Sequence, residues 1–529
     1  MRALPFALAL LAAPAGAAFV AAPVAAQSPP QSLPGAPAVS ALPGGREAPP
    51  ARPLAEPPVS VGVTTGAVSV APLGPPGASS GVLPSNVTGL PDDLWAGSDA
   101  GLLSDMIGNL PESMPRAARA LERVMMLAEA DPPASGDAEA LLAARLARLV
   151  DRGHLDAAAA LAARTGARSP TLRREAFDIA LLMGDESEAC QLTDPEAEDP
   201  QDYGRRVFCL VRVGDFAAAA TVLDSARALG RLDPVDEVLL EIFLYPELLD
   251  EIVPPEAPRR PTPMQFRLYE ALGEPLATRD LPVAFARSDM RPINGLKAQI
   301  EAAERLARAG ALEGSRLLAL YTDRRPSASG GVWDRAAALR DLDAALMAAN
   351  REATALALPR AVEALDAADL TATMADAIYP QVAALAPEGA EAETAALRLG
   401  LMSSDYEAAA GLWPEADAPH VEAARAVARG KAPEGTAPGT ETGAGSEDAL
   451  DAAVHDAFAP GAPIPERLSR PAAEGRLGEA LLLALSDLSA GEAGDRGRLA
   501  GALAFLRSVG LEDTARRTAI ELLIGRDAA

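Results

Sequence analysis

The chain has 529 residues and carries 47 Lys and Arg against 74 Asp and Glu, which gives a formal net charge of −27. This excess of negative charge argues against nucleic acid and anionic lipid surfaces as partners of the whole chain. The length suffices for two to four conventional domains, or for one long repeat array, because an array needs no single large core.

Residues 1–26 have the three zones of a secretory signal peptide. Arg2 lies at the start, residues 4–20 are apolar, and small residues precede Gln27. We expect cleavage after Ala26 and an exported, periplasmic mature chain in a Gram-negative envelope. The alternative is an uncleaved anchor, but Pro14 and Pro23 interrupt a span that needs about 20 apolar residues. No later segment predicts a stable transmembrane span.

Residues 27–90 contain 14 prolines and few charges, with neither a helical nor a strand period. Such a composition buries too little apolar surface to offset the entropy of ordering the chain. We therefore predict a disordered tether rich in Pro, Ala and Gly over residues 27–90.

From Leu94 onward, apolar residues recur at helical spacing, as at Leu142, Leu146 and Leu149, with arginines between them. Breaks at Gly, Asp, Pro or Ser follow every 12 to 18 residues. Residues with strand preference are too sparse for a sheet. The pattern predicts an all-α fold.

The breaks are periodic in one block. Gly153, Gly184 and Gly214 are 31 and 30 residues apart, and an alanine follows each glycine by five positions. This pattern predicts a helix that ends at glycine, a short turn, and a second helix that packs closely through its small residue.

The segment Gly214-Asp215-Phe216, followed by Ala219, resembles the inter-helix turn of tetratricopeptide repeats, and Pro170 stands where such repeats often close. The resemblance covers about a third of the chain and departs from the 34-residue period of that family. It implies antiparallel helix pairs stacked as an α-solenoid, with a protein-binding or scaffolding surface. The chain also resembles alanine-rich exported proteins of the bacterial envelope.

Composition divides the helical part into segments. We expect a first repeat block over residues 91–253, a Pro-rich bridge over 254–263 and a second repeat block over 264–430. A low-complexity linker over 431–448 then precedes a C-terminal helical segment over 449–529.

The only two cysteines are Cys190 and Cys209. Because export places them where disulfides persist, we predict a bond between them. It would join the second helix of one pair to the first helix of the next. The alternative is two small buried hydrophobic residues.

The search for chemistry predicts no catalytic, cofactor-binding or metal-binding residues. The three histidines are scattered, and none has a metal-ligand spacing. Soluble lytic transglycosylases combine an envelope location with a helical superhelix, and Glu112-Ser113, Glu186-Ser187 and Gly400-Leu401-Met402 echo their motifs. These pieces lie far apart in the chain, and the catalytic domain of that family is missing.

Residues 321–335 form the most distinctive local segment, because Arg324, Arg325 and Trp333 combine charge with an aromatic ring around a glycine-rich turn. This composition is typical of a binding loop for acidic groups or glycans. The alternative is a plain helix connection in which Trp333 anchors the next helix in the core.

We therefore expect a non-enzymatic periplasmic scaffold or adaptor that binds other envelope proteins and needs no cofactor. The alternative is a peptidoglycan- or glycan-acting envelope enzyme or accessory subunit.

Overall fold

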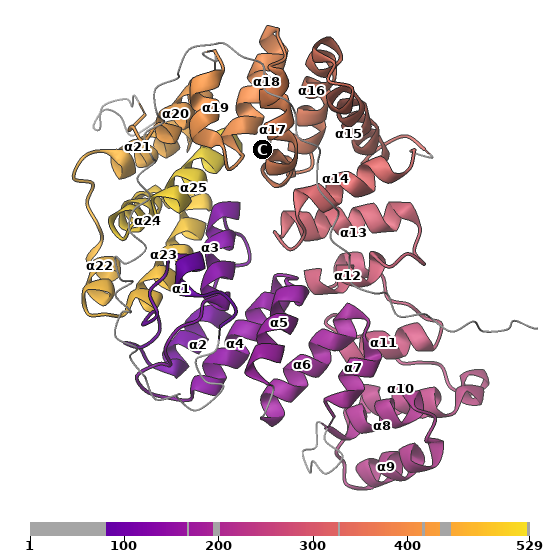
Figure 1. Ribbon diagram of the computed structural model, residues 1–529. Coiled ribbons are helices and arrows are strands. Elements are labelled where there is room, and N and C mark those ends of the chain that lie inside the picture. Colours follow the sequence, from indigo (N-terminus) through magenta and orange to yellow (C-terminus); the bar gives the residue numbers. More distant parts are fainter. Residues whose placement is uncertain are drawn as a thin grey trace, which may run out of the picture. The chain divides into compact units, whose positions relative to one another are not determined.

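The computed structural model describes residues 81–166, 169–193, 202–325, 328–414, 418–433 and 446–525. The predicted signal peptide, most of the predicted tether and most of the predicted linker 431–448 lie outside these residues. The described residues form 25 α-helices and three 3₁₀ helices and contain no strand, so the all-α prediction is confirmed (Figure 1).

The first helices are α1 (Ser85–Thr88), α2 (Ala100–Gly108), α3 (Arg116–Leu127), α4 (Ala138–Asp151), α5 (Leu155–Thr165), α6 (Pro170–Met183), α7 (Glu186–Gln191), α8 (Asp202–Arg212), α9 (Phe216–Ala228), α10 (Pro234–Leu244), η1 (Pro246–Asp250) and α11 (Pro263–Ala271). The middle helices are η2 (Thr278–Asp280), η3 (Val283–Phe285), α12 (Ala286–Asp289), α13 (Leu296–Arg308), α14 (Gly314–Asp323), α15 (Val332–Met347), α16 (Arg351–Asp366), α17 (Thr371–Leu385) and α18 (Ala390–Leu401). The last helices are α19 (Tyr406–Leu412), α20 (Pro419–Ala428), α21 (Ser446–Phe458), α22 (Glu466–Ala473), α23 (Leu477–Glu492), α24 (Arg496–Ser508) and α25 (Glu512–Ile524).

The periodic glycines end helices as the spacing predicts. Gly153, Gly184 and Gly214 all have φ between 79° and 88°, a left-handed conformation that favours glycine after a helix. The alanines five positions later, at 158, 189 and 219, are fully buried in α5, α7 and α9. The small side chain therefore sits where the second helix of each pair packs into the core.

The described structure begins earlier than the predicted end of the tether at residue 90. The backbone N–H groups of Val82 and Leu83 donate to the carbonyl of Leu127, and Leu90 is buried in the core. The tether prediction is therefore wrong for residues 81–90. The cause is tertiary, since the end of α3 supplies hydrogen-bond partners that no local sequence signal reveals.

The Pro-rich segment 254–263 does not separate two cores. It leads into α11, which contacts both α10 and α6. Leu240 before the segment and Met264 and Leu268 after it belong to one hydrophobic cluster. Of the residues described, none forms a helix with the length and apolar character needed to cross a bilayer.

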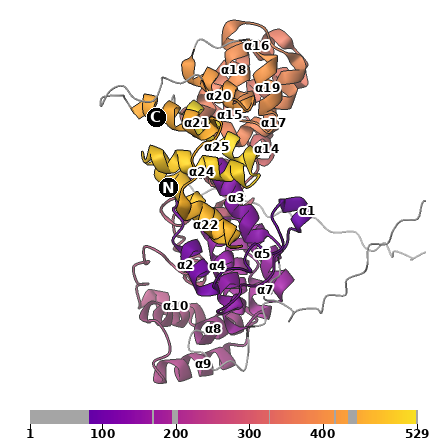
Figure 2. The same cartoon turned by 90° about the vertical axis from the view of Figure 1, so that its left-hand side faces the viewer.

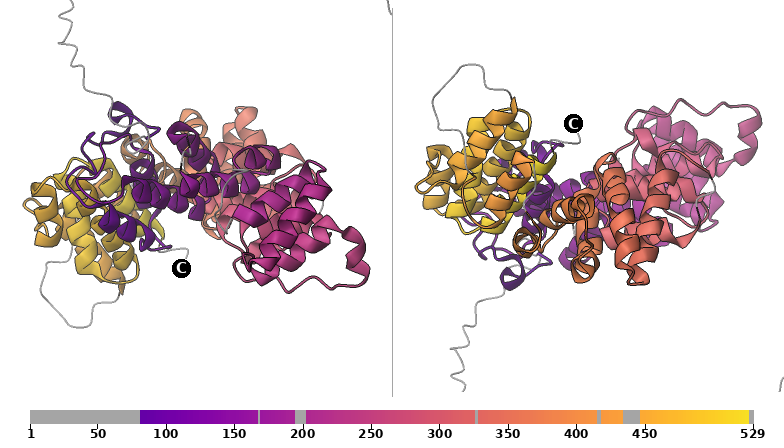
Figure 3. Two further views of the ribbon diagram at one scale, coloured as in Figure 1. Left: turned by 90° about the horizontal axis from the view of Figure 1, so that it is seen from below. Right: turned by 90° about the horizontal axis from the view of Figure 1, so that it is seen from above.

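The last helices of the chain contact the first ones. Helix α25 packs on α3, and α23 packs on α2 and α3. Figures 1, 2 and 3 show the yellow C-terminal helices beside the indigo N-terminal helices. At this contact the N–H of Gly478 donates to the carbonyl of Leu94 at 3.0 Å, and Trp95 is buried. The predicted C-terminal segment is therefore part of the main core, and residues of α2 to α6 and of α12 to α25 share one hydrophobic cluster.

Candidate functional site

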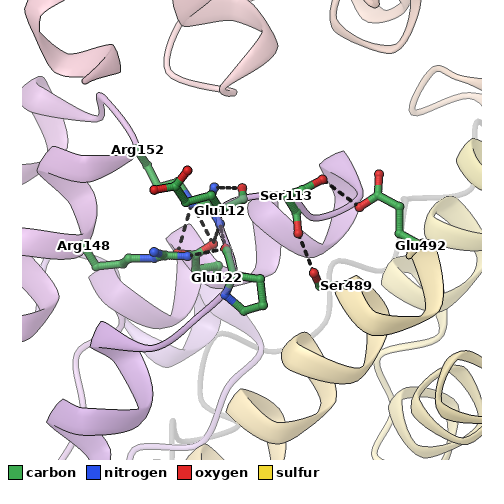
Figure 4. A network of polar contacts seen from close by, with 8 residues as sticks. Glu112, Ser113, Glu122, Arg148, Arg152, Ser489 and Glu492 are labelled. Atoms are coloured by element: carbon green, nitrogen blue, oxygen red, sulfur yellow. Dashed lines mark hydrogen bonds and ion pairs between the residues drawn. The ribbon is translucent and has the colours of Figure 1, made fainter. Parts of the chain in front are cut away.

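A polar network holds the loop that leads into α3 (Figure 4). Arg148 of α4 and Arg152, which directly follows α4, donate to the carbonyl of Pro111 at 2.9 and 2.8 Å. On the other side, Ser489 of α23 donates to the carbonyl of Ser113 at 2.6 Å. The hydroxyl of Ser113 donates to Glu492 at 3.1 Å. The loop is thus fixed between α4 and the C-terminal helices.

Glu122 of α3 is the buried charge at the centre of this network. Its carboxylate is only 2% exposed and forms ion pairs with Arg148 and Arg152, the latter at 3.0 Å. Two guanidinium groups therefore compensate one buried carboxylate, as a charge removed from water requires. The arrangement fixes the register of α3 against α4.

The start of α3 is held by the other end of the chain. The carboxylate of Glu521 in α25 accepts from the backbone N–H of Arg116 at 2.7 Å and of Ala117 at 3.2 Å. These donors have no partner within the helix, because the first four N–H groups of a helix point outward. Burial raises the pKa of Glu521, and the two N–H groups and the nearby arginines oppose that effect.

The end of α3 is capped by a buried arginine. Arg145 of α4 donates to the carbonyls of Met126 and Ala128, both at 2.8 Å. Burial lowers the pKa of Arg145 to about 10. Both ends and one face of α3 are therefore held rigidly by named partners.

The opposite face of α3 carries a stripe of arginines. Arg116, Arg119 and Arg123 are three and four positions apart, a spacing that places them on one side of a helix. The side chains of Leu121 and Met125 are buried on the core side. The network thus presents three guanidinium groups from one rigid helix.

Two neighbouring cavities lie along this part of the molecule. The first, here called the His154 cavity, has a volume of about 500 Å³. It is lined by Arg116, Arg119, Ala120, Arg123, His154, Asp156, Ala157, Arg287, Ala309, Gly310, Ala311, Leu312, Glu313 and Arg316. These residues come from α3, the start of α5, α12 and the turn from α13 into α14.

The second, here called the Asp151 cavity, has a volume of about 480 Å³. It is lined by Glu112, Arg148, Asp151, Arg152, Arg259, Arg260, Asp280, Leu281, Pro282, Val283, Arg305 and Ala309. Ala309 lines both cavities. Asp151 and Arg152 line the Asp151 cavity, and His154, two positions later in the turn between α4 and α5, lines the other. The two cavities are therefore neighbours.

The lining of the two cavities is rich in arginine. It contains ten arginines and five carboxylates, in a chain whose acidic residues outnumber its basic ones. Part of the negative charge is already paired, since Asp156 contacts Arg287 at 3.1 Å. The site is thus a local concentration of positive charge within an acidic protein, and its chemistry suits an anionic ligand.

The titration of His154 reflects this positive field. Its pKa is lowered to about 4, first by burial and then by the charges of Arg123, Arg152 and Arg119. In addition, the Nε of Arg119 is buried without a hydrogen-bond partner among the described residues. A buried donor without a partner is costly, and such groups often mark a place for a water molecule or an ion.

The sequence-predicted binding loop lies elsewhere and does not bring its residues together. Arg324 and Arg325 are exposed after α14, and Arg324 pairs with Asp323 at 3.1 Å. Trp333 is 9% exposed and belongs to the hydrophobic core at the start of α15. The structure therefore contradicts a binding surface that includes the ring of Trp333. It agrees with the alternative interpretation, in which Trp333 anchors α15 in the core.

Cys190 of α7 and Cys209 of α8 form a disulfide, with their Cα atoms 5.4 Å apart. The bond joins consecutive helices on either side of the chain segment 194–201, which lies outside the described residues. It belongs to the cluster of α6 to α11 and takes no part in the arginine-lined cavities.

The fragments that echo lytic transglycosylases do not converge. Glu112 lines the Asp151 cavity, Glu186 pairs with Arg212 on α8, and Met402 lines a different cavity. Within the described ranges, no group of three or more His, Cys, Asp or Glu side chains could hold a metal ion.

Sequence reasoning missed the arginine-lined cavities. The spacing of Arg116, Arg119 and Arg123 was a visible signal, but an exposed helix face has the same pattern. Comparison with known proteins adds no family to this description, because no family model, curated protein or solved structure matches the chain.

Proposed function

We propose that this chain is an exported α-solenoid of the tetratricopeptide-like type, which acts in the cell envelope as a non-enzymatic scaffold that binds another protein. The observation that carries the proposal is the pair of neighbouring arginine-lined cavities, one of which is lined by the rigidly held helix α3. Their positive lining contrasts with the net charge of −27 and provides a defined place for an anionic partner. The paired helices and their left-handed glycines support the solenoid architecture.

The proposal is tested by crosslinking in intact cells. A photo-crosslinking residue placed at Glu313, which lines the His154 cavity and is exposed, should yield a discrete protein adduct. The same residue at Glu363, exposed on α16, is the control and should yield none. The adduct from position 313 should disappear when Arg123 and Arg316 are replaced by Gln.

The alternative function, action on peptidoglycan or another glycan, has its own readout. Sedimentation of the protein with isolated sacculi, without a protein adduct at position 313, would contradict the scaffold proposal. Release of soluble muropeptides from sacculi by the purified chain would contradict its non-enzymatic character.

A further inference from the structure

The proposed function leaves open which chemistry the cavities recognise. Their donors with spare capacity are arginines. Arg119 has a buried Nε without an acceptor among the described residues. Arg123 and Arg316 are exposed at the rim of the His154 cavity, and Arg259 and Arg260 are exposed at the Asp151 cavity. In the described part of the chain, the guanidinium groups of these four exposed arginines form no ion pair.

Guanidinium groups match carboxylates in shape as well as in charge. The planar fork of arginine donates two parallel hydrogen bonds to one carboxylate, whereas lysine offers a point charge. Both cavities contain arginine and no lysine. A ligand in either cavity therefore meets guanidinium donors.

The distribution of the charges separates an extended ligand from a compact one. Two exposed arginines without an ion pair among the described residues lie at each cavity, Arg123 and Arg316 at one and Arg259 and Arg260 at the other, and the two linings share only Ala309. A single phosphate could contact one pair but would leave the other pair without an anion. Each cavity lies within the range of about 300 to 1,000 Å³ that is typical of ligand sites. The pair therefore suits a chain that carries separated negative charges.

A long polyanion is disfavoured by the rest of the surface. The net charge of −27 repels nucleic acid or another uniformly charged polymer outside the cavities. A polypeptide can confine its carboxylates to a short segment and remain neutral elsewhere. It also supplies backbone groups that hydrogen-bond to polar lining residues such as Glu313.

From these observations we infer that the two arginine-lined cavities together bind an acidic segment of a partner polypeptide, with at least one carboxylate in each cavity. This inference rests on the proposed function, since it specifies the chemistry of the protein partner. Arg119, Arg123 and Arg316 hold a carboxylate in the His154 cavity. Arg259 and Arg260 hold a second carboxylate in the Asp151 cavity.

The direct test uses a fluorescein-labelled peptide of twelve residues that alternates Glu and Ser, and the purified full-length chain. Fluorescence anisotropy should show saturable binding that weakens with added salt, because the contacts are ionic. The matched peptide with Gln in place of Glu should not bind. Equal binding of both peptides, or no binding of the acidic peptide, overturns the inference.

Two double variants locate the binding. Replacing Arg123 and Arg316 by Gln should raise the Kd at least about tenfold, because both side chains lose their charge-assisted hydrogen bonds to the bound carboxylate. The control replaces Arg324 and Arg325, an exposed pair outside both cavities, and should change the Kd by less than about twofold. Equal losses in the two variants overturn the inference, because they indicate a nonspecific charge effect.

His154 gives a readout that a purely structural role would not move. Its pKa is lowered to about 4 in the free chain, first by burial and then by Arg123, Arg152 and Arg119. The other charged residues that line the same cavity are Arg116, Asp156, Arg287, Glu313 and Arg316. A carboxylate bound there should raise the pKa of His154, since a nearby negative charge favours the protonated imidazole. The imidazole resonance should therefore titrate at a higher pH when the acidic peptide is bound than in the free chain.

The chain has only three histidines, so the resonance of His154 is assigned by the loss of one signal in His154→Asn. An unchanged resonance at peptide saturation overturns the placement of the ligand in this cavity. Muropeptides and unlabelled acidic peptide are then compared as competitors of the labelled peptide. If muropeptides displace it at the lower concentration, the assignment of the ligand to a polypeptide is overturned.

The results separate this inference from the proposed function. An adduct at position 313 in cells, together with no binding of the acidic peptide, leaves the scaffold function and removes the acidic segment. Cavity-dependent peptide binding with no adduct in cells supports the acidic-ligand chemistry and contradicts the scaffold function.

Discussion

The carboxylate of Glu521 accepts a hydrogen bond of 2.7 Å from the backbone N–H of Arg116, although 405 positions separate the two residues. The bond places the last helix of the described structure at the start of α3. Because α3 carries the arginine stripe of the His154 cavity, the C-terminal end of the chain helps to position the candidate site.

Replacing Glu521 by Ala should destabilise the protein by about 1 to 3 kcal/mol, because two backbone donors of α3 lose a buried acceptor. Denaturant unfolding followed by circular dichroism measures the change. The control Glu363→Ala lies on an exposed position of α16 and should remain within about 0.5 kcal/mol of the wild type. Equal effects of the two substitutions would show that the hydrogen bonds between Glu521 and the start of α3 contribute nothing to stability.

Gly478 of α23 lies at another contact between the C-terminal and the N-terminal helices, where it meets Leu94 and Trp95. Alanine is the better helix former by about 1 kcal/mol, so Gly→Ala inside a helix normally stabilises. A Cβ at position 478, however, would lie 2.6 Å from the carbonyl oxygen of Leu94 and 2.6 Å from the ring of Trp95. We expect Gly478→Ala to destabilise the protein, although alanine has the higher helix propensity.

The matched control for that substitution is Gly497→Ala in α24. A Cβ at position 497 would find its nearest neighbour, an oxygen of Asp495, at 3.8 Å, which is ordinary contact. This variant should be neutral or more stable by up to about 1 kcal/mol. Melting temperatures of the two variants check the expectation, and a stabilised Gly478→Ala would mean that the two ends do not pack closely.

Glu122 should be the most sensitive charged residue near the site. Removing its carboxylate leaves Arg148 and Arg152 without their buried counter-charge, and such a loss costs about 3 to 5 kcal/mol. The comparison is Glu129→Ala, whose carboxylate is 48% exposed and pairs with Arg164 at 3.7 Å. That control should change the free energy of unfolding by less than about 1 kcal/mol.

A second experiment separates charge from packing at Glu122. If the cost comes from the two uncompensated arginines, Glu122→Gln should lose nearly as much stability as Glu122→Ala, although its side chain has almost the wild-type volume. Wild-type stability of Glu122→Gln would show that the ionic part of the network is dispensable.

The helices could be predicted from the sequence because their signals are local. The leucines at 142, 146 and 149 lie on the buried face of α4, and Gly153 ends that helical segment with a positive φ. Both the periodicity and the glycine act within a few residues. The same holds for Pro170, which begins α6.

The candidate site could not be predicted, because it depends on contacts between distant segments. The arginines that alternate with those leucines would lie in solvent on an ordinary amphipathic helix. Instead, Arg145 and Arg148 are buried, because Arg145 meets the carbonyls at the end of α3 and Arg148 meets Glu122. The role of Trp333, in a binding loop or in the core, could not be decided from the sequence for a related reason. The sequence shows a bulky ring but not the distant residues of the core around it.

The disulfide between Cys190 and Cys209 should stabilise the part of the molecule from α6 to α11. The bond closes a loop with a sequence separation of 19, which corresponds to about 3 kcal/mol in the chain-entropy description. Replacing both cysteines by Ala should therefore speed amide hydrogen exchange in α7 and α8, while α15 and α16 stay unchanged. Reducing agent should reproduce the effect in the wild type and add nothing in the double variant.

His154 should make the stability of the protein depend on pH. Its pKa falls from an ordinary 6.5 to about 4 in the folded chain, because the imidazole is buried and faces Arg119, Arg123 and Arg152. Below pH 6.5 the unfolded chain therefore binds a proton that the folded chain does not. Its contribution to stability is complete above pH 6.5 and is lost as the pH falls toward 4.

Between pH 7 and 5.5, this single group should lower the free energy of unfolding by about 1 kcal/mol. The variant His154→Asn has no titrating ring, so its stability should fall by about 1 kcal/mol less than that of the wild type over the same range. Urea unfolding at the two pH values measures the difference. An identical pH dependence in the variant would mean that His154 is protonated as easily in the folded chain as in the unfolded one. Burial and the arginine stripe would then have no effect on the pKa of His154.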